Sequence, residues 1–325
     1  MKYRTFGNTD LEISEIGLGT WQFGGDWGQI TDSVAKAVLD TAIRCGINFF
    51  DTADVYGAGR SESIIGNFLK DKNEPVFIAT KLGRLEGFPD SYSLELFRRC
   101  TENSLKRLGR DCIDLTQLHC VPQNLLVSGE VFDWLRVLQN EGKIRYFGAS
   151  VETIEEALVC LEQDGLSSLQ IIFNIFRQKP SGLLFEKAAQ KGVALIIRVP
   201  LASGLLSGKF TRETGFEPGD HRSYNRNGEA FNAGETFSGL DFEYGIELTN
   251  QLKEYVPTDI TMAQFALRWI LDHPEISVVI PGASKTSQVE SNASASDLKP
   301  LGNNLHTILK SFYNEKVDQY IRGRR

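Results

Sequence analysis

The sequence predicts an α/β protein, a (β/α)8 TIM barrel with a short N-terminal β-hairpin and a C-terminal helix. Short apolar runs typical of strands alternate with amphipathic segments typical of helices, and this alternation requires parallel pairing of the strands. Eight such runs are present, which is the number that closes a barrel, and 325 residues suit one barrel. We therefore expect a single barrel domain over residues 1–325.

The elements follow from local signals. A turn signal at Gly7 to Asp10 lies between two short apolar runs and predicts a hairpin within residues 1–14. The eight strand-like runs cover residues 16–19, 47–50, 76–80, 113–118, 144–148, 169–173, 193–199 and 277–280. The first helix is expected to begin at Thr31 or Asp32, with Val34, Val38 and Ala42 on its buried face. Further helices are expected at 61–70, 93–108, 129–140, 153–163 and 181–190, before the last strand, and over 305–317.

A doubly wound open sheet is the competing fold. Such a sheet usually carries a GxGxxG loop directly after its first strand. Here Gly17 and Gly19 are followed by Gln22, and no third glycine stands in register. The repeat count and this difference favour the barrel.

One segment interrupts the alternation. Residues 206–243 are polar and glycine-rich, with little periodicity, and they follow the seventh strand. Loops of this length in compact domains are usually lids or binding loops. A disordered surface excursion is the alternative interpretation.

Composition limits the classes of function. A net charge of −7 argues against duplex nucleic acid as a partner, because phosphate binding requires a basic face. Five cysteines without a CxxC pair indicate neither a disulfide framework nor a zinc site, so we expect no metal and a reducing, cytoplasmic location. No apolar run is long enough to span a membrane. A monomer is expected, with an oligomer left open.

Four residues that can move a proton stand just past predicted strand ends. Asp51 and Tyr56 follow the second strand, Lys81 the third and His119 the fourth, and in a barrel these ends converge on one mouth. A lysine beside a tyrosine would lower the phenol pKa, and the aspartate would keep that lysine charged. The histidine could bind a substrate oxygen. The set predicts a general acid, although each residue alone is more often structural.

A proton donor without a nucleophile, metal cluster or carboxylate pair suggests carbonyl reduction, with hydride supplied by a cofactor. Residues 281–292 follow the eighth strand and open a helix, where backbone N–H groups, a hydroxyl and a lysine favour an anion. The turn at 200–209 could hold a second phosphate. Either segment alone is a weak signal.

Together these motifs resemble the aldo-keto reductase superfamily over nearly the whole chain. The resemblance is carried by residues 17–21, 51–57, 81, 118–119, 142–150, 170–174, 200–209 and 280–292. It implies a barrel that uses NADPH (NADP+), with Tyr56 as proton donor supported by Asp51, Lys81 and His119.

The resemblance also implies the cofactor contacts. Ser150 and Gln170 would meet the nicotinamide carboxamide, and Trp21 would line the nicotinamide or substrate pocket. The pyrophosphate would be met by Leu201, Ser203, Gly204 and Lys209, the 2′-phosphate by Ser284 and Lys285, and the adenine side by Gln288 and Asn292. The full set of expected cofactor-binding residues is Gly19, Thr20, Trp21, Ser150, Gln170, Arg198, Pro200, Leu201, Ser203, Gly204, Lys209, Gly282, Ser284, Lys285, Gln288 and Asn292.

Three positions depart from the family pattern. Val151 replaces the asparagine that usually follows the serine, and Ser291 replaces a glutamate before Asn292. Arg198 stands where many members stack a tyrosine on the nicotinamide. We expect its charge to weaken binding of NADP+ relative to NADPH, or its side chain to turn toward an acidic substrate or partner.

The leading functional hypothesis is an NADPH-dependent oxidoreductase that reduces aldehydes or ketones to alcohols. A cofactor-binding regulatory subunit of the channel β-subunit type and a cofactor-free barrel hydrolase are the alternatives. The substrate pocket is expected from loops at 21–27, 84–89, 120–124 and 206–243. An aromatic mouth is expected from Trp21, Phe23, Trp27 and Phe88.

Overall fold

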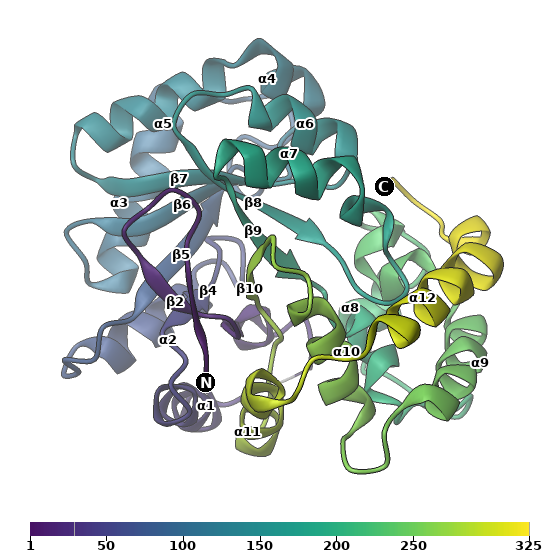
Figure 1. Cartoon of the computed structure of the whole chain (residues 1–325). Helices are drawn as coiled ribbons and strands as arrows, with labels where there is room; N and C mark the ends of the chain where they lie inside the picture. The colour runs from purple at the N-terminus through teal and green to yellow at the C-terminus, as the bar shows by residue number, and fades with distance from the viewer. Residues whose placement is uncertain (29, 325) are drawn as a thin grey trace.

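A closed parallel barrel is the centre of the computed structural model, which describes residues 1–28 and 30–324 (Figure 1). Eight parallel strands pair in chain order from β3 to β10. The backbone N–H of Gly17 donates to Val279 O at 2.8 Å and that of Gly19 to Pro281 O at 3.1 Å, which joins the first strand to the last. The strands are β3 Leu18–Gly19, β4 Phe49–Asp51, β5 Phe77–Leu82, β6 Ile113–His119, β7 Ile144–Ser150, β8 Leu166–Ile172, β9 Ala194–Arg198 and β10 Ile276–Val279.

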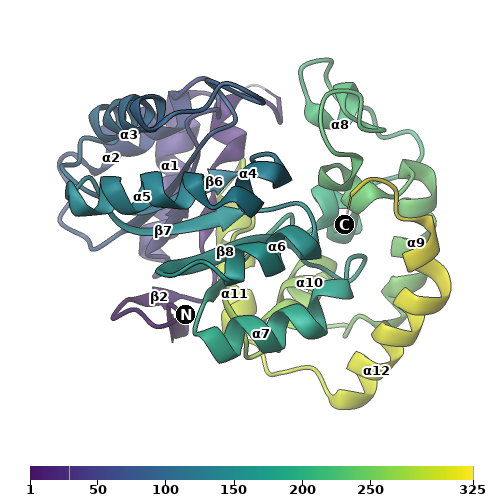
Figure 2. The same ribbon diagram turned by 90° about the horizontal axis from the view of Figure 1, so that it is seen from above.

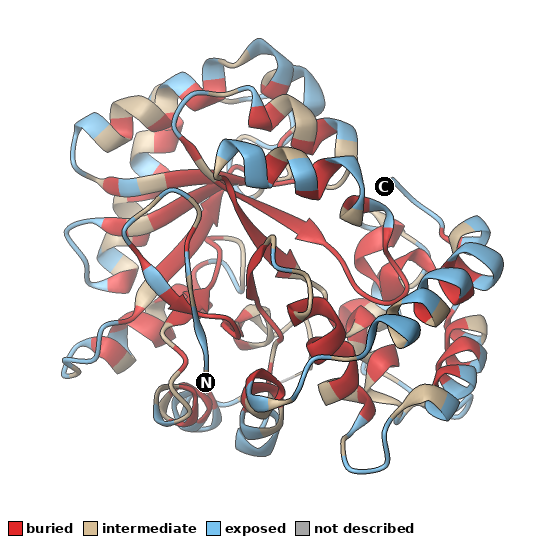
Figure 3. Cartoon of the chain, in the orientation of Figure 1, coloured by how far each residue is buried: buried red, intermediate tan, exposed pale blue. Residues whose placement is uncertain are grey.

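The predicted barrel and its N-terminal hairpin are confirmed. Strands β1 (Tyr3–Thr5) and β2 (Glu12–Ser14) form the antiparallel hairpin. The helices are α1 Asp32–Arg44, α2 Arg60–Leu69, α3 Leu94–Leu108, α4 Gln123–Ser128, α5 Glu130–Asn140, α6 Ile154–Leu161, α7 Leu183–Lys191, α8 His221–Tyr224, α9 Phe242–Leu252, α10 Met262–Leu271, α11 Thr286–Ser294 and α12 Asn303–Phe312. Most of them surround the sheet with their buried faces toward it, whereas α8, α9 and α12 lie together to one side of it (Figures 2 and 3).

Three helices and one helix face differ from expectation. None of α4, α8 and α9 was predicted, although the Asp241 side chain caps α9 by accepting from the N–H of Glu243 at 3.0 Å. Val34 is 39% exposed rather than buried, because Ala35, Val38 and Leu39 occupy the inner face of α1. The buried face predicted for α1 was therefore wrong by about one position in its first turn, whereas Val38 and Ala42 are buried as predicted.

Three of the four candidate proton-transfer residues lie on the strands rather than just past them, whereas Tyr56 lies in the turn after β4. Asp51 is the last residue of β4, Lys81 lies inside β5 and His119 ends β6. The ladder continues through these polar residues: Lys81 is in register with Gln117, and His119 with Ser150. The Lys81 side chain is paired with Asp51 inside the barrel, so a polar residue can continue the strand.

The segment 206–243 is packed against the barrel and is not a disordered excursion. Phe237 and Leu240 are fully buried in it. The Asn225 side chain accepts from the N–H groups of Ala230 at 2.9 Å and Phe231 at 2.8 Å, which fixes the turn. Its contacts with the loops of the barrel make it a cover for the carboxyl ends of the strands.

The C-terminal helix was predicted and is present. Helix α12 continues through residues 313–317 and lies beside α9 (Figure 2), where the Tyr244 hydroxyl donates to Lys316 O at 2.8 Å. The Arg322 N–H then donates to Gly239 O at 2.9 Å, which ties the tail to the 206–243 segment. Within the part of the chain that the structure describes, no helix combines the length and hydropathy needed to cross a bilayer.

Candidate active site

One cavity of about 810 Å³ runs from the carboxyl ends of the barrel strands to the start of α11. It is lined by every residue that the sequence predicted to bind cofactor except Ser150 and Lys285. Asp51, Tyr56 and His119 also line it, whereas Lys81 is fully buried. The predicted cofactor segments and the predicted proton-transfer residues therefore share one continuous space.

Asp51, Lys81 and Tyr56 form a chain of contacts at the inner end of the cavity. Lys81 Nζ donates to Asp51 Oδ1 at 2.5 Å and to Thr52 O at 2.8 Å. The same ammonium lies 3.3 Å from the Tyr56 hydroxyl and 5.0 Å from the centre of its ring. Burial alone would lower the pKa of Lys81, but Asp51 and Tyr56 raise it. The lysine therefore stays charged beside the phenol.

The pKa of Tyr56 differs in direction from the expectation. Burial of the phenol raises its pKa above the ordinary value, and the attraction of Lys81 offsets only part of that rise. The prediction of a net lowered pKa was wrong because the sequence does not show how deeply the ring is buried. A buried phenol beside an ammonium is protonated in the resting state, and the charge stabilises the phenolate once the proton leaves.

His119 is the second polar group next to the phenol. Its ring meets the Tyr56 ring edge to face, with centroids 6.0 Å apart. Burial, then the charges of Arg84, Lys81 and Arg198, hold the His119 pKa well below its ordinary value. Among the described residues its Nδ1 has no hydrogen-bond partner. A neutral imidazole here can donate to, or accept from, a polar atom that enters the cavity.

Close backbone packing fixes the position of Tyr56. Gly57 has φ of 60°, and a Cβ there would lie 2.7 Å from Gly24 O. Only glycine fits both demands, so the loop after β4 and the loop after β3 touch directly. The Trp21 ring stacks on Tyr56, with centroids 5.9 Å apart and planes 19° apart. The ring is thereby aimed into the cavity.

Two glutamines hold the other oxygen of the aspartate. Gln170 Nε2 donates to Asp51 Oδ2 at 2.7 Å, and Gln117 Nε2 lies 3.4 Å from the same oxygen. The expected role of Gln170 was at a nicotinamide carboxamide, and Gln117 was not anticipated. The nearby Ser150 Oγ is buried without a hydrogen-bond partner among the described residues. A buried hydroxyl of this kind is suited to a polar group of a bound molecule.

The outer half of the cavity is shaped for a molecule that approaches the backbone. Ser203 and Gly204, in the turn after β9, have φ of 54° and 101°. A Cβ on Gly282 would overlap the amide group of the Gln22 side chain, which would then have to move. At the start of α11, Gln288 Oε1 accepts from the N–H groups of Ser284 at 2.8 Å and Lys285 at 3.2 Å.

The aromatic mouth is only partly as expected. Trp21 and Trp27 line the cavity, but Phe23 is fully buried elsewhere and Phe88 is 47% exposed outside it. Phe231, from the 206–243 segment, lines the cavity instead. Its position depends on long-range packing, with the Trp21 and Phe231 rings 6.2 Å apart, which no local pattern signals.

Two arginines and a glutamate in the cavity wall form a group that the sequence did not reveal. Arg84 Nη1 lies 3.1 Å from Glu235 Oε1, and Arg198 Nη1 lies 3.7 Å from the same oxygen. Arg198 Nη2 also donates to Val151 O at 3.1 Å. Burial would raise the pKa of Glu235, but the two guanidiniums outweigh it and bring the pKa to about 2.

Comparison with known proteins fixes the family. The family model described as "Aldo/keto reductase family" matches residues 15–314. The chain belongs to the aldo/keto reductase family. The resemblance drawn from the motifs is thereby confirmed, and the enzyme class follows from it: the chain is an aldo-keto reductase, an NAD(P)H-dependent oxidoreductase.

Relatives and solved structures agree with this aldo-keto reductase assignment. Aldo-keto reductase YhdN of Bacillus subtilis is 32% identical over 303 residues, covering 89% of this chain and 87% of the relative. The NADH-specific methylglyoxal reductase of Escherichia coli is 30% identical over 318 residues, covering 91% of this chain and 93% of the relative. The solved aldo-keto reductase AKR11C1 from Bacillus halodurans, in its holo form, has a TM-score of 0.78 with 28% identity, covering 96% of each chain.

Proposed function

We propose that this aldo-keto reductase uses NADPH to reduce aldehydes or ketones to alcohols, with Tyr56 as the proton donor. The observation that carries the proposal is the Tyr56 hydroxyl, 3.3 Å from the charged Nζ of Lys81 at the inner end of the cavity. A phenol in this position is protonated at rest and gives a stabilised phenolate, as a general acid must. The relatives named above are reductases, so the regulatory-subunit alternative is not favoured.

The other polar residues support this proton transfer. Asp51 keeps Lys81 charged, and Gln170 and Gln117 keep Asp51 in place. Neutral His119 offers a ring nitrogen to the carbonyl oxygen and so orients it toward Tyr56. Trp21 and Trp27 add aromatic surface to the cavity wall.

The residues along the cavity fit the cofactor. The unpartnered Oγ of Ser150, which is in register with the cavity-lining His119, suits the carboxamide. Gly204 and Gly282 add no side chain to the cavity wall where the pyrophosphate would lie. The start of α11, with Ser284 and Lys285, favours a 2′-phosphate and hence NADPH. When bound, the cofactor supplies the hydride. Since one relative is named as NADH-specific, the preference must be measured with both dinucleotides.

Tyr56→Phe is the decisive test. We expect kcat/KM for a panel of aldehydes and ketones to fall by about a thousandfold or more, because the phenylalanine ring has no hydroxyl proton to donate. The dissociation constant for NADPH, measured by the change in nicotinamide fluorescence, should stay within about threefold of wild type. A Phe variant that reduces carbonyls at the wild-type rate would refute the role of Tyr56.

A further inference from the structure

Arg84, Arg198 and Glu235 form a charged cluster beside the reaction centre, with Glu152 next to it. Their side chains are 16%, 11% and 6% exposed, and all three line the cavity. Arg84 lies in the loop after β5 and Arg198 at the end of β9. Glu235 lies in the segment 206–243 that covers the barrel, called the covering segment below. The two guanidiniums act electrostatically on His119, and Arg198 also on Tyr56. The cluster therefore lies close to where a carbonyl oxygen would be protonated.

One glutamate does not use all the donors that these arginines offer. Arg198 Nε is buried and has no hydrogen-bond partner among the described residues. The contact between Arg198 Nη1 and Glu235 Oε1 is 3.7 Å, which is longer than a hydrogen bond. A guanidinium presents five N–H donors in a fork that matches a carboxylate. The pair is thus only partly satisfied by Glu235.

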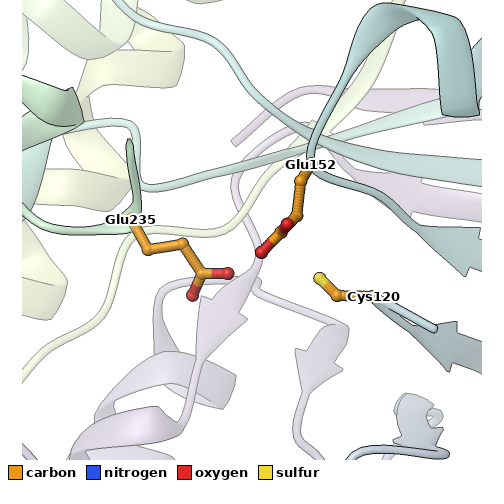
Figure 4. A group of neighbouring side chains, drawn as sticks. All are labelled: Cys120, Glu152 and Glu235. Carbon is orange, nitrogen blue, oxygen red and sulfur yellow. The ribbon is translucent and has the colours of Figure 1, made fainter. Parts of the chain in front are cut away.

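The neighbouring acids do not turn this cluster into a cation site. Figure 4 shows Cys120, Glu152 and Glu235 pointing toward one another, with ligand atoms within 4.8 Å. Burial raises the pKa of the Cys120 thiol to about 11, so it is a neutral thiol. Glu152 is paired with Arg324 at 3.2 Å, and Glu235 faces the two arginines. Burial and the charge of Glu235 raise the pKa of Glu152, and Arg84 and Arg198 offset part of that rise. Both acids therefore already face guanidiniums.

We propose that Arg84 and Arg198 bind the carboxylate of an oxo-acid substrate, and that Glu235 occupies this carboxylate site when the cavity is free of substrate. The proposal rests on the carbonyl reductase function given above and names its substrate class. Glu235 shows that a carboxylate oxygen fits between the two guanidiniums. A substrate carboxylate takes the same position, engages Arg198 Nε and displaces the Glu235 carboxylate from the two guanidiniums.

Matched carbonyl pairs test the substrate class. The pairs are succinic semialdehyde against butanal and 4-carboxybenzaldehyde against its methyl ester, each with NADPH. We expect kcat/KM of the wild type to be about tenfold or more higher for the acid of each pair, as one charge-assisted bidentate contact would give. Equal values for acid and neutral partner would overturn the inference and leave the reductase function standing. Failure to reduce any carbonyl would overturn both.

Two variants distinguish a substrate-binding role of the arginine–glutamate cluster from a purely structural role. In Arg84→Met the acid-to-neutral ratio of kcat/KM should fall by about tenfold, whereas in Glu235→Gln it should rise severalfold because the internal competitor is weakened. Arg99→Met is the matched control, since Arg99 is exposed and pairs only with Glu86 in the described contacts, and it should leave the ratio unchanged. If the arginines merely held the covering segment, Arg84→Met and Glu235→Gln would weaken NADPH binding together and leave the ratio unaltered, which would overturn the proposal.

A phosphorylated aldehyde tests whether the site prefers a carboxylate to a phosphate. Glyceraldehyde 3-phosphate is compared with glyceraldehyde in the same assay. We expect the preference for this phosphate to be smaller than the preference for the carboxylates, because Glu235 defines a site of carboxylate size. A larger preference for the phosphate would overturn the carboxylate assignment.

Discussion

The floor and the roof of the cavity are held by different kinds of contact. The floor is the set Asp51, Tyr56, Lys81 and His119, and three of these four residues lie on adjacent strands. Its ion pair, Lys81 with Asp51, is buried within the barrel and joined to the strand ladder. Proton-transfer geometry on the floor therefore depends on the barrel itself.

The roof, residues 221–240, is held by side chains that reach across the chain. Ser203 Oγ donates to Glu235 O at 3.2 Å and accepts from the N–H of Phe237 at 3.1 Å. Asn174 Nδ2 donates to Ser238 Oγ at 2.8 Å. At the other edge, the N–H of His221 donates to Asp26 O at 2.9 Å.

This difference separates chemistry from selectivity. The floor can keep its arrangement while the roof changes, because few of its contacts involve residues 221–240. Glu235 is the roof residue that faces Arg84 and Arg198, and under the proposal above a substrate carboxylate replaces it there. We infer that the floor sets the reaction and that the roof sets which carbonyl compound reaches it.

The largest effect on stability is expected from breaking the ion pair of the floor. Lys81→Met leaves Asp51 as a buried carboxylate with only glutamine donors, which should lower the free energy of unfolding by about 3–5 kcal/mol. The turnover number should fall by about a hundredfold or more, because the phenolate loses its counter-charge. Urea denaturation and steady-state kinetics measure the two effects.

The double variant Asp51→Asn with Lys81→Met is the control for this ion pair. Removing both charges leaves no unpaired buried ion, so much of the stability should return while the activity stays low. A double variant no more stable than Lys81→Met alone would contradict the account of the floor.

A smaller and pH-dependent effect is expected at Asp54, beside the floor. Burial first, then the charge of Glu62, raises its pKa to about 7. Neither carboxylate oxygen has a hydrogen-bond partner in residues 1–28 and 30–324. Because the folded state binds this proton more tightly than the unfolded chain, the free energy of unfolding should fall as pH rises from about 4 to about 7, by a few kcal/mol.

Asp54→Asn removes this titration. Relative to wild type, the variant should gain stability by about 3 kcal/mol between pH 5 and pH 8, as followed by urea denaturation at each pH. Thermal melts at both pH values give an independent readout. Parallel pH profiles for wild type and variant would show that Asp54 is not the source.

The smallest effect is expected at Arg198, where floor and roof meet. Its charge should disfavour the cationic ring of NADP+, so Arg198→Ala should lower the dissociation constant of NADP+ relative to that of NADPH by about threefold to tenfold. Fluorescence titration with each dinucleotide measures the ratio. If the two dissociation constants are equal in both wild type and variant, Arg198 has no part in discriminating the redox forms.

Much of the barrel could be predicted because its signals are local. Strand-like runs such as 113–118 are bounded by turn residues, and Gly109 ends the helix before it. Helix α9 was missed because it follows a long irregular segment, although Asp241 is an ordinary N-cap. The single-domain assignment over residues 1–325, the cytoplasmic location and the monomeric state stay predictions.

By itself, the sequence determined which residues could act together on the floor. Each of Asp51, Lys81 and His119 stands at a fixed place on its strand, so closing the barrel brings them together. Only the tertiary structure decided the net direction of the Tyr56 pKa, because burial of the ring outweighs its neighbouring charge. It also decided the pairing of Arg84 with Glu235, which are 151 positions apart and meet only through the packing of the roof.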